Sequence, residues 1–503
     1  MASWTGGWAP ASALGVALAA GWAAAQGAPS RPDTVLNPGF EAVAGGVPSG
    51  WLVQKPNGKA AFRFETVPGR HGKGARLSLA DAGEGMGVPY GAVYQEIDAT
   101  PYRGKRIRFR ASLKVVKPGV TVGLGLRVER PGPKSAGFSD MMQGDWLAAG
   151  DWTDVEIVGR VAIDAVKIWV AVNARGDADV SFDDVAFEAV PIDTSPPSHE
   201  ARDYLGRAIA ILRDKHIDSR TADWPRIIAD AHADIGGAKT PRDTYPAIRG
   251  VLGALGEKHS FLVAAPRAKA PAAPGAPAAK PVEPPMPTSE LIGGRIGVVR
   301  LPALGGIGVG QDVPDRYTGT LRTALKAMDD VATCGWIVDL RGNGGGNMWP
   351  MQRGLDPLLG KAPFGTFEDV AGNVTYWQRN MGNIFPSPGR IASGSADGPY
   401  FSLRNSRAPL AVLIGPGTAS SGEMVAIALV GREGVRLFGT NSANYVTGNS
   451  VFPLSDGASL VVTGTYVFDR TGKAYDSAIV PDVLTGDAQG EAVRWLTGQC
   501  KAA

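Results

Sequence analysis

Cysteine and histidine are scarce in this sequence. The 503 residues include two cysteines, Cys334 and Cys500, and five histidines. These residues form no CxxC or HExxH motif, so the sequence does not support a zinc site or a cysteine nucleophile, and no metal or cofactor is expected. Export would allow a disulfide between the two cysteines, but the sequence does not show whether they lie close together.

Basic stripes and long apolar runs are also missing. The net charge is only +3 and Lys and Arg do not cluster, so nucleic acid is not an expected partner. The apolar stretch Ala11–Ala25 ends in alanines that fit a cleavage site. Residues 1–26 are therefore expected to be a signal peptide, although they contain no Lys or Arg and could instead be a disordered leader. No other stretch is long enough to cross a membrane, so the mature protein is expected to be periplasmic or secreted, without a membrane span.

A period of two dominates residues 33–192. Polar and apolar residues alternate in several segments, which are separated by turns rich in Gly, Pro and Asp. The clearest of these segments are residues 106–115, 120–128, 166–172 and 180–187. The pattern predicts an antiparallel β-sandwich.

Three short motifs of this segment resemble those of galactose-binding-like jelly-roll modules that are appended to secreted enzymes. They are LNPGFE near the start, the dipeptide GW at residues 50–51, and FDDVAFE at the end. Many such modules bind carbohydrate, so the resemblance implies carbohydrate as a second partner. Trp51, Trp146 and Trp152 could stack on sugar rings, or they could pack in the core.

Acidic side chains near the two ends of this segment allow another interpretation. Glu41 with Asp183 or Asp184 could hold a structural calcium ion, because oxygen ligands suit a hard cation. Such acids are more often turn residues, so both interpretations stay open.

The remainder of the chain divides into three parts. Apolar residues recur at helical spacing between residues 196 and 263, which predicts a small segment of about three helices. Residues 264–288 consist mainly of Ala, Pro and Lys and are expected to form an extended tether. In residues 289–499, strands followed by glycine loops and helices predict an α/β core that binds ligands at the carboxyl ends of its strands.

Three motifs in these parts could carry chemistry. GPGTASSGEM, residues 415–424, follows an apolar strand, and Ser420 with Glu423 has the spacing of a helix capping box. The same serine could be a nucleophile at a helix N-terminus, where free N–H groups stabilise an oxyanion. DLRGNGGG, residues 339–346, could be a simple turn or could bring an N–H close to a substrate carbonyl. His259 in GEKHSFL is the best available general base.

Together and in this order, the three motifs resemble those of the tail-specific, or C-terminal processing, serine peptidase family. The resemblance is strongest to the branch that contains the tricorn core protease and the interphotoreceptor retinoid-binding repeats. It implies a crotonase-like α/β core and a peptide or protein substrate. No PDZ domain fits between His259 and Arg295, so the family's usual device for capturing C-termini is not expected.

The resemblance also assigns roles to residues of the two glycine motifs. The nucleophile falls on Ser420. The oxyanion donors fall on the backbone N–H groups of Gly345 and Ser421, with Gly344 as the alternative to Gly345.

The general base departs from the common pattern of the family. Bacterial members use a Ser–Lys dyad, but residues 439–450, where the lysine would lie, contain none, and Thr447 precedes Gly448 where the family has Lys-Gly. A Ser–Lys mechanism is excluded unless a distant lysine substitutes, so the base falls on His259, as in the tricorn-like branch. Asp476 is the expected acid that orients His259, and Glu423 is the second choice because it is also the capping partner.

The resulting hypothesis is an exported serine peptidase that works through an acyl-enzyme. An alternative is a non-catalytic protein that binds a ligand on the same scaffold. A third possibility is a carbohydrate-directed protein whose function resides in the β-sandwich, where no pair of carboxylates indicates glycosidase activity.

Overall fold

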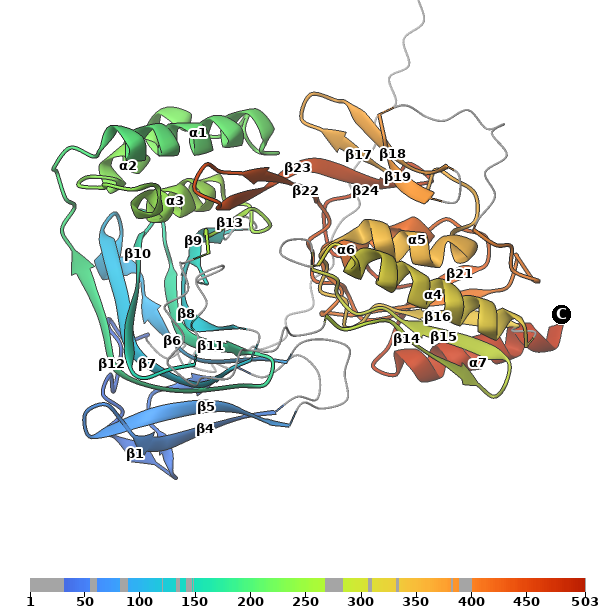
Figure 1. Cartoon of the computed structure of the whole chain (residues 1–503), viewed down its shortest axis with the longest axis horizontal. Helices are drawn as coiled ribbons and strands as arrows, with labels where there is room; N and C mark the ends of the chain where they lie inside the picture. Colours follow the sequence, from blue (N-terminus) through green and yellow to red (C-terminus); the bar gives the residue numbers. More distant parts are fainter. Residues whose placement is uncertain are drawn as a thin grey trace, which may run out of the picture. The chain divides into compact units, whose positions relative to one another are not determined.

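The structure is a computed structural model, and Figure 1 shows the whole chain. It describes residues 31–54, 61–81, 89–119, 121–132, 136–141, 147, 149–266, 284–305, 310–331, 334–380, 383–388 and 400–502. The predicted signal peptide, Trp146 and most of the predicted tether lie outside these residues. Within the described part of the chain, no helix is both long and apolar enough to cross a membrane.

Two five-stranded antiparallel sheets form the N-terminal module, as the period of two predicted. The first sheet has the order β10 (Thr153–Arg160), β7 (Arg106–Pro118), β12 (Ala178–Val190), β5 (Lys73–Asp81) and β4 (Ala61–Pro68). The second has the order β3 (Leu52–Val53), β6 (Tyr90–Asp98), β11 (Lys167–Arg175), β8 (Thr121–Glu129) and β9 (Ala136–Asp140). The small elements beside them are β1 (Val43–Ala44), β2 (Val47–Pro48) and the 3₁₀ helix η1 (Thr100–Tyr102). The predicted β-sandwich is confirmed.

Alternate residues of these strands fill one shared core. In β7, Ile107, Phe109 and Leu113 are fully buried, which is the outcome expected when one face of a pleated strand packs on a second sheet. Trp51 also belongs to this core, where its ring lies 5.3 Å from that of Phe40. The prediction that Trp51 could stack on a sugar ring is therefore wrong, because the side chain is only 6% exposed.

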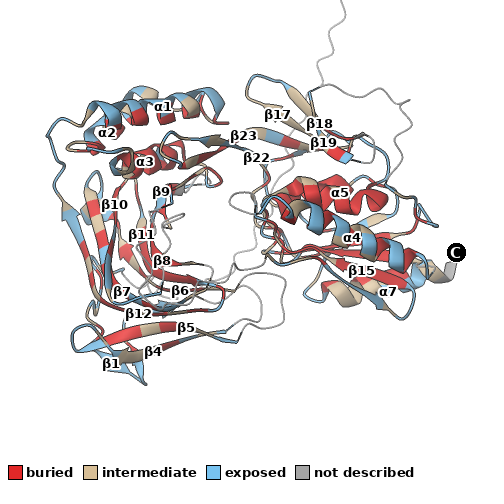
Figure 2. Cartoon of the chain, in the orientation of Figure 1, coloured by how far each residue is buried: buried red, intermediate tan, exposed pale blue. Residues whose placement is uncertain are grey.

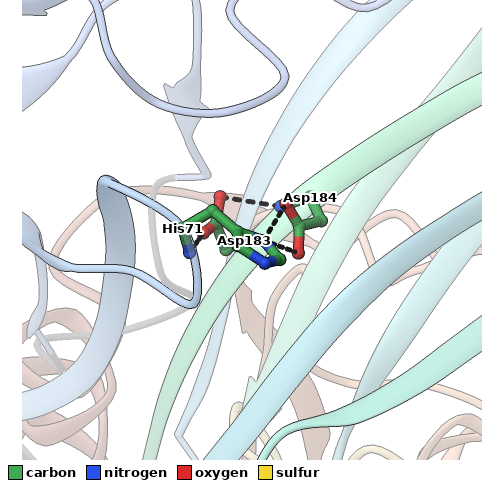
Figure 3. A group of neighbouring side chains, drawn as sticks. All are labelled: His71, Asp183 and Asp184. Atoms are coloured by element: carbon green, nitrogen blue, oxygen red, sulfur yellow. Dashed lines mark hydrogen bonds and ion pairs between the residues drawn. The ribbon is translucent and has the colours of Figure 1, made fainter.

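Two of the acids considered as calcium ligands, Asp183 and Asp184, lie in β12 at a shift of its register with β7. Buried Asp183 accepts the N–H groups of His71 and Asp184, and Glu41 accepts the N–H of Lys73. Figure 3 shows the His71 ring reaching Asp184, with Nδ1 3.0 Å from a carboxylate oxygen. Possible ligand atoms of His71, Asp183 and Asp184 lie within 4.8 Å of one another. These acids thus take part in hydrogen bonds within the module, and the calcium site stays a prediction.

Three helices follow the sandwich, as predicted from the helical spacing. They are α1 (His199–Lys215), α2 (Trp224–Asp234) and α3 (Tyr245–Leu255), with the 3₁₀ helix η2 (Pro241–Thr244) before α3. Gly256 ends α3 in a left-handed conformation with φ 75°, which glycine adopts without a steric penalty. Arg249 of α3 forms a 2.9 Å ion pair with Asp140 of β9, and both side chains are buried. His259 comes directly after this anchored helix.

A six-stranded sheet with helices on both faces forms the centre of the C-terminal part. Its order is β14 (Thr288–Ile292), β15 (Ile296–Arg300), β16 (Gly335–Asp339), β20 (Leu410–Ile414), β21 (Val435–Gly439) and β25 (Val483–Leu484), and only the β14–β15 pair is antiparallel. The helices are α4 (Val313–Asp329), α5 (Met348–Leu359), α6 (Ser421–Leu429) and α7 (Ala488–Ala502). Val338 packs toward α4, α5 and α6, whereas its neighbour Ile337 packs toward α7. Figure 2 shows β15 as buried. The strand–loop–helix pattern therefore gave the predicted α/β arrangement.

A second sheet is built around one long strand, β23 (Ser459–Asp469). It runs without interruption through Gly464. Its sheet contains β13 (Phe261–Val263), β17 (Gly365–Asp369), β18 (Val374–Asn380), β19 (Asn383–Ser387), β22 (Gly448–Pro453) and β24 (Ala474–Tyr475). Both β13 and β22 pair with β23, so segments far apart in the sequence are held by one strand.

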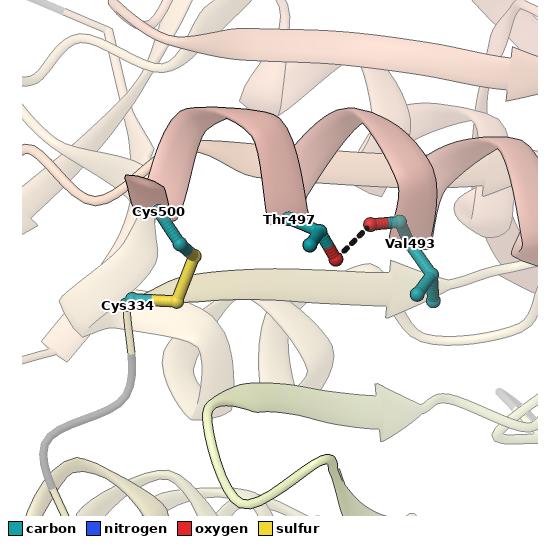
Figure 4. The surroundings of a disulfide bond; sticks show 4 residues. All are labelled: Cys334, Val493, Thr497 and Cys500. Carbon is teal, nitrogen blue, oxygen red and sulfur yellow. Dashed lines mark hydrogen bonds between the residues drawn. A yellow bond between two sulfur atoms is a disulfide. The ribbon is translucent and has the colours of Figure 1, made fainter. Parts of the chain in front are cut away.

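Cys334 and Cys500 form a disulfide, which the sequence left open. Their Cα atoms lie 5.7 Å apart, and the bond ties the last turns of α7 to the residue that precedes β16 (Figure 4). The bond spans a sequence separation of 166 residues, so it closes a large loop around the α/β core.

Candidate active site

The loops that follow β16 and β20 meet at one edge of the parallel sheet. Neighbouring parallel strands bring their carboxyl ends together, which is where ligands bind in open α/β sheets. The Ala419 N–H donates to the Asn343 carbonyl at 2.9 Å, and the Thr418 hydroxyl donates to the Leu340 carbonyl at 2.8 Å. A Cβ at Gly422 would lie 2.3 Å from the Asn343 oxygen, so this contact requires glycine. The glycines of the two motifs allow the loops to pack tightly.

Ser420 stands directly before α6 in a strained backbone conformation. Its φ of 52° and ψ of −119° are unusual for a residue other than glycine. Such strain costs on the order of 1–3 kcal/mol and is often found where a side chain has a function. The Ser420 N–H donates to Glu423 at 2.9 Å, which is one half of the predicted capping box.

The His259 ring lies between two hydroxyl groups. Its Nε2 is 2.9 Å from Ser420 Oγ, and its Nδ1 is 2.8 Å from Thr447 Oγ1. The side chain is only 6% exposed, and its ring makes an edge contact with the Tyr445 ring at 5.1 Å. A serine within hydrogen-bond reach of a histidine that has a third partner is the arrangement of an activated nucleophile.

The backbone of His259 is fixed on both sides. Its N–H donates to Glu257 at 2.7 Å, and its carbonyl accepts from the Asn449 side chain at 2.8 Å. The Asn449 side chain also accepts from the Thr463 hydroxyl, which belongs to β23. His259 therefore has little freedom to move relative to the sheet.

Burial controls the charges around this ring. It lowers the pKa of His259 from 6.5 to about 4, and the positive charge of Lys258 acts in the same direction. Burial also lowers the pKa of Lys258 and raises the pKa of both Glu257 and Glu423. The imidazole is consequently neutral near pH 7, as a general base must be.

Glu423 braces the loop above the site rather than the imidazole. Its carboxylate accepts the Ser442 hydroxyl at 2.5 Å, the Asn444 N–H at 2.9 Å and the Tyr445 N–H at 2.8 Å, besides the Ser420 N–H. The second-choice prediction that Glu423 holds His259 is therefore wrong, because its acceptor sites are occupied by backbone and hydroxyl donors.

Asp476 does not lie against His259. It is exposed, it follows the buried Tyr475 at the end of β24, and Nδ1 of His259 is bonded to Thr447 instead. The prediction of Asp476 as the orienting acid rested on matching a terminal motif, and the observed contacts contradict it. The sequence did hold a signal for Thr447, since this residue stands where the family has lysine.

The predicted oxyanion donors differ in their surroundings. The Gly345 N–H donates to the Asn343 side chain at 3.1 Å, and its role as an oxyanion donor stays a prediction. A Cβ at Gly344, the alternative, would meet nothing within 4 Å, so its backbone borders open space. Ser421 is the first residue of α6, and its hydroxyl donates to the Gly346 carbonyl at 2.6 Å. Gly345, Gly344 and Ser421 therefore all stay predicted oxyanion donors.

The loops, the helix N-terminus and the Ser–His contact together have the layout of a serine hydrolase site. Residues 295–485 match peptidase family S41. Over these residues the chain is similar to the serine-type peptidases of this family. The matched segment contains both glycine motifs, whereas His259 precedes it.

Known proteins with related sequences or structures include two from bacteria. The nisin-resistance protein of Lactococcus lactis subsp. lactis is 28% identical over 307 residues, which cover 61% of this chain and 89% of that protein. A lipoprotein from Streptococcus agalactiae is 24% identical, with a TM-score of 0.49, over 62% of this chain and 100% of that chain. The photosystem II D1 C-terminal processing protease is 17% identical, with a TM-score of 0.39, over 58% of this chain and 94% of that chain.

Proposed function

We propose that this protein is an exported peptidase that cleaves peptide bonds through an acyl-enzyme, with Ser420 as nucleophile and His259 as general base. The observation that carries the proposal is the 2.9 Å contact between His259 Nε2 and Ser420 Oγ. It joins side chains 161 residues apart in the sequence, at the carboxyl edge of the sheet.

In the proposed reaction, His259 takes the Ser420 proton while Oγ attacks the substrate carbonyl. The Ser421 and Gly344 N–H groups hold the resulting oxyanion, and each such donor is worth about 3 kcal/mol in comparable sites. His259 then gives its proton to the leaving amine, and a water molecule hydrolyses the acyl-enzyme with His259 again as base.

Lys258 precedes His259 in the sequence and is the lysine that we consider for a Ser–Lys mechanism. Its ammonium group lies 4.4 Å from the centre of the Tyr445 ring and 3.4 Å from the Ala443 carbonyl. These contacts favour a role in holding the loop rather than in deprotonating Ser420. We therefore expect Lys258→Ala to keep activity and His259→Ala to lose it.

A fluorophosphonate probe tests this assignment without knowledge of the substrate. Wild type should be labelled on Ser420, as located by mass spectrometry, and Ser420→Ala should be unlabelled with an unchanged melting temperature. His259→Ala should be labelled far more slowly, whereas the matched control Lys258→Ala should behave as wild type. An unlabelled Ser420 in wild type would favour the non-catalytic ligand-binding alternative. Loss of labelling in Lys258→Ala alone would favour the Ser–Lys alternative.

Export is supported by the disulfide and by the leader. A disulfide between Cys334 and Cys500 is typical of an oxidising compartment, and residues 1–26 have the composition of a signal peptide. Sequencing the N-terminus of the protein recovered from the periplasm or the medium tests this, and an intact leader on a cytoplasmic product would contradict it.

We propose an antimicrobial peptide of the nisin type as the first substrate to test. The proposal draws on the relative's name, nisin-resistance protein. Incubation of nisin with wild type, and with Ser420→Ala as control, should give defined fragments by mass spectrometry with wild type alone. Intact nisin after incubation with an enzyme that the probe does label would reject the substrate and keep the mechanism.

The N-terminal module offers a second candidate function, carbohydrate binding. Tyr90, Tyr94 and Trp169 lie together on the face of β6 and β11 that points away from the sandwich core. Asn173 on the same face is buried, and its Nδ2 has no hydrogen-bond partner. Trp169 is buried, whereas Tyr90 and Tyr94 are half-buried, and their rings suit stacking on a sugar. Tyr94→Ala should therefore reduce retention on a glycan array if this function is present. Equal retention of the variant would exclude this face.

A further inference from the structure

We propose that the Thr447 hydroxyl positions His259 for catalysis, in the place that a carboxylate occupies in a Ser–His–acid triad. The inference rests on the proposed roles of Ser420 and His259 and adds a third, uncharged member. Thr447 acts through the histidine and does not touch the reacting atoms, so it is a positioning residue.

The contacts of the ring favour Thr447 over any acid. Of the described residues, none places a carboxylate in hydrogen-bond contact with the His259 ring, whose two nitrogens contact Ser420 and Thr447. The carboxylates of Glu257 and Glu423 bond to other groups. Glu257 accepts the N–H of His259 itself, and Glu423 accepts hydroxyl and backbone donors.

The position of one proton decides whether the histidine can act as a base. A neutral imidazole carries a proton on one nitrogen only. When that proton is on Nδ1 and is donated to Thr447 Oγ1, Nε2 is left with a lone pair that accepts the Ser420 hydroxyl. The other tautomer would direct an N–H at Ser420 and could not take its proton. A buried N–H without an acceptor is costly, and the Thr447 oxygen gives the Nδ1 proton an acceptor in the productive tautomer, which a side chain without a hydroxyl would not.

The sheet holds Thr447 at the required place. Thr447 directly precedes β22, and His259 lies two residues before β13; both strands pair with β23. The next residue, Gly448, has no spare room, because a Cβ there would lie 2.1 Å from the Thr465 hydroxyl oxygen. The Asn449 side chain then bonds the His259 carbonyl at 2.8 Å. The start of β22 therefore contacts His259 at both its ring and its backbone.

An uncharged partner also fits the charges that face the ring. Lys258 lies next in the sequence, Tyr445 packs on the ring edge, and the Glu257 and Glu423 carboxylates lie in the surrounding network. Thr447 adds no negative charge to this set, which agrees with the lowered pKa of His259. A carboxylate in place of Thr447 would favour the imidazolium and raise that pKa by about 1 to 3 pH units.

The test measures the rate at which a fluorophosphonate labels Ser420, as a function of pH, in the full-length protein. Thr447→Val keeps the shape and removes the hydroxyl, and we expect it to slow labelling by about 10-fold, the equivalent of one hydrogen bond. Thr447→Ser restores the hydroxyl and should return the rate close to that of wild type. Thr447→Asp should move the acid limb of the rate to higher pH.

Each outcome bears on one proposal. If Thr447→Val is labelled as fast as wild type, or if Thr447→Ser is as slow as Thr447→Val, the positioning role is overturned and the residue only packs. An unshifted acid limb in Thr447→Asp, with melting temperature preserved, would also overturn it. If wild type is not labelled on Ser420, or if His259→Ala is labelled at the wild-type rate, the underlying peptidase mechanism fails and this inference fails with it.

Discussion

The pH dependence of catalysis follows directly from the burial of His259. Burial, and then the charge of Lys258, lower its pKa to about 4, so the imidazole remains able to accept the Ser420 proton down to about that pH. We expect the acid limb of kcat/KM, or of the labelling rate of Ser420, to have its midpoint near pH 4. An unperturbed histidine would place that midpoint at about pH 6.5.

The same group makes the stability of the fold depend on pH in a defined direction. Above about pH 6.5 the imidazole is neutral in both the folded and the unfolded chain. Between that pH and about pH 4, the unfolded chain takes up a proton that the folded chain does not, so stability falls as the pH falls. At about 1.4 kcal/mol per pH unit, the loss reaches about 3 kcal/mol and stops growing below the folded pKa.

Two acids of the site act in the opposite direction and must be separated from this effect. Burial raises the pKa of Glu257 and Glu423, and a carboxyl group with a raised pKa adds stability as the pH falls. The assay therefore compares urea unfolding of wild type and His259→Asn between about pH 7 and about pH 4. Relative to the variant, wild type should lose about 3 kcal/mol over this range. The reasoning would be refuted if the difference in unfolding free energy between wild type and His259→Asn did not change with pH and the acid limb lay at about pH 6.5.

Three other outcomes are expected. Replacing Cys334 and Cys500 by serine should lower the free energy of unfolding in urea by about 5 kcal/mol, because their bond closes a loop of 166 residues. Treating wild type with reductant should cause a loss of the same size. Gly345→Ala should abolish probe labelling while the fold persists by circular dichroism, since the new Cβ would lie 2.8 Å from that of Ser420; full labelling would contradict this. Glu423→Gln should slow labelling by roughly 10-fold, because an amide cannot accept all the hydrogen bonds that the carboxylate accepts; an unchanged rate would show that the braced loop does not matter.

Local pattern was enough to predict some of the elements. Alternation in segments such as 106–115 predicted the sandwich strands, and the helical spacing predicted α1, α2 and α3. The pairing of Ser420 with His259 came from motif resemblance, and their side chains lie 2.9 Å apart. These features depend on short-range periodicity or on motifs that are recognised within short stretches of sequence.

The contacts that sequence reasoning missed are set by long-range register. Thr447 meets His259 across 188 residues only because β13 and β22 both pair with β23, and no local pattern encodes that alignment. Asp476 was chosen because the resemblance matched its segment to a terminal motif of the family, but its place after β24 leaves it exposed. The bond from the Gly345 N–H to the Asn343 side chain was not predicted either.

A neutral, buried imidazole is a weak base in the resting site, and this weakness is compatible with catalysis. When Ser420 attacks, a negative charge develops on the carbonyl oxygen, and an opposite charge within about 4–6 Å raises a histidine pKa by about 1 to 3 pH units. A carboxylate on Nδ1 would stabilise the imidazolium both before and during the reaction. Because the Thr447 hydroxyl carries no charge, the imidazolium of His259 is stabilised mainly by the oxyanion, which exists only during the reaction. Only interactions that strengthen on the way to the transition state accelerate the chemical step. His259, with an uncharged partner, therefore gains basicity when the substrate carbonyl is attacked, and in the absence of substrate it stays neutral down to about pH 4.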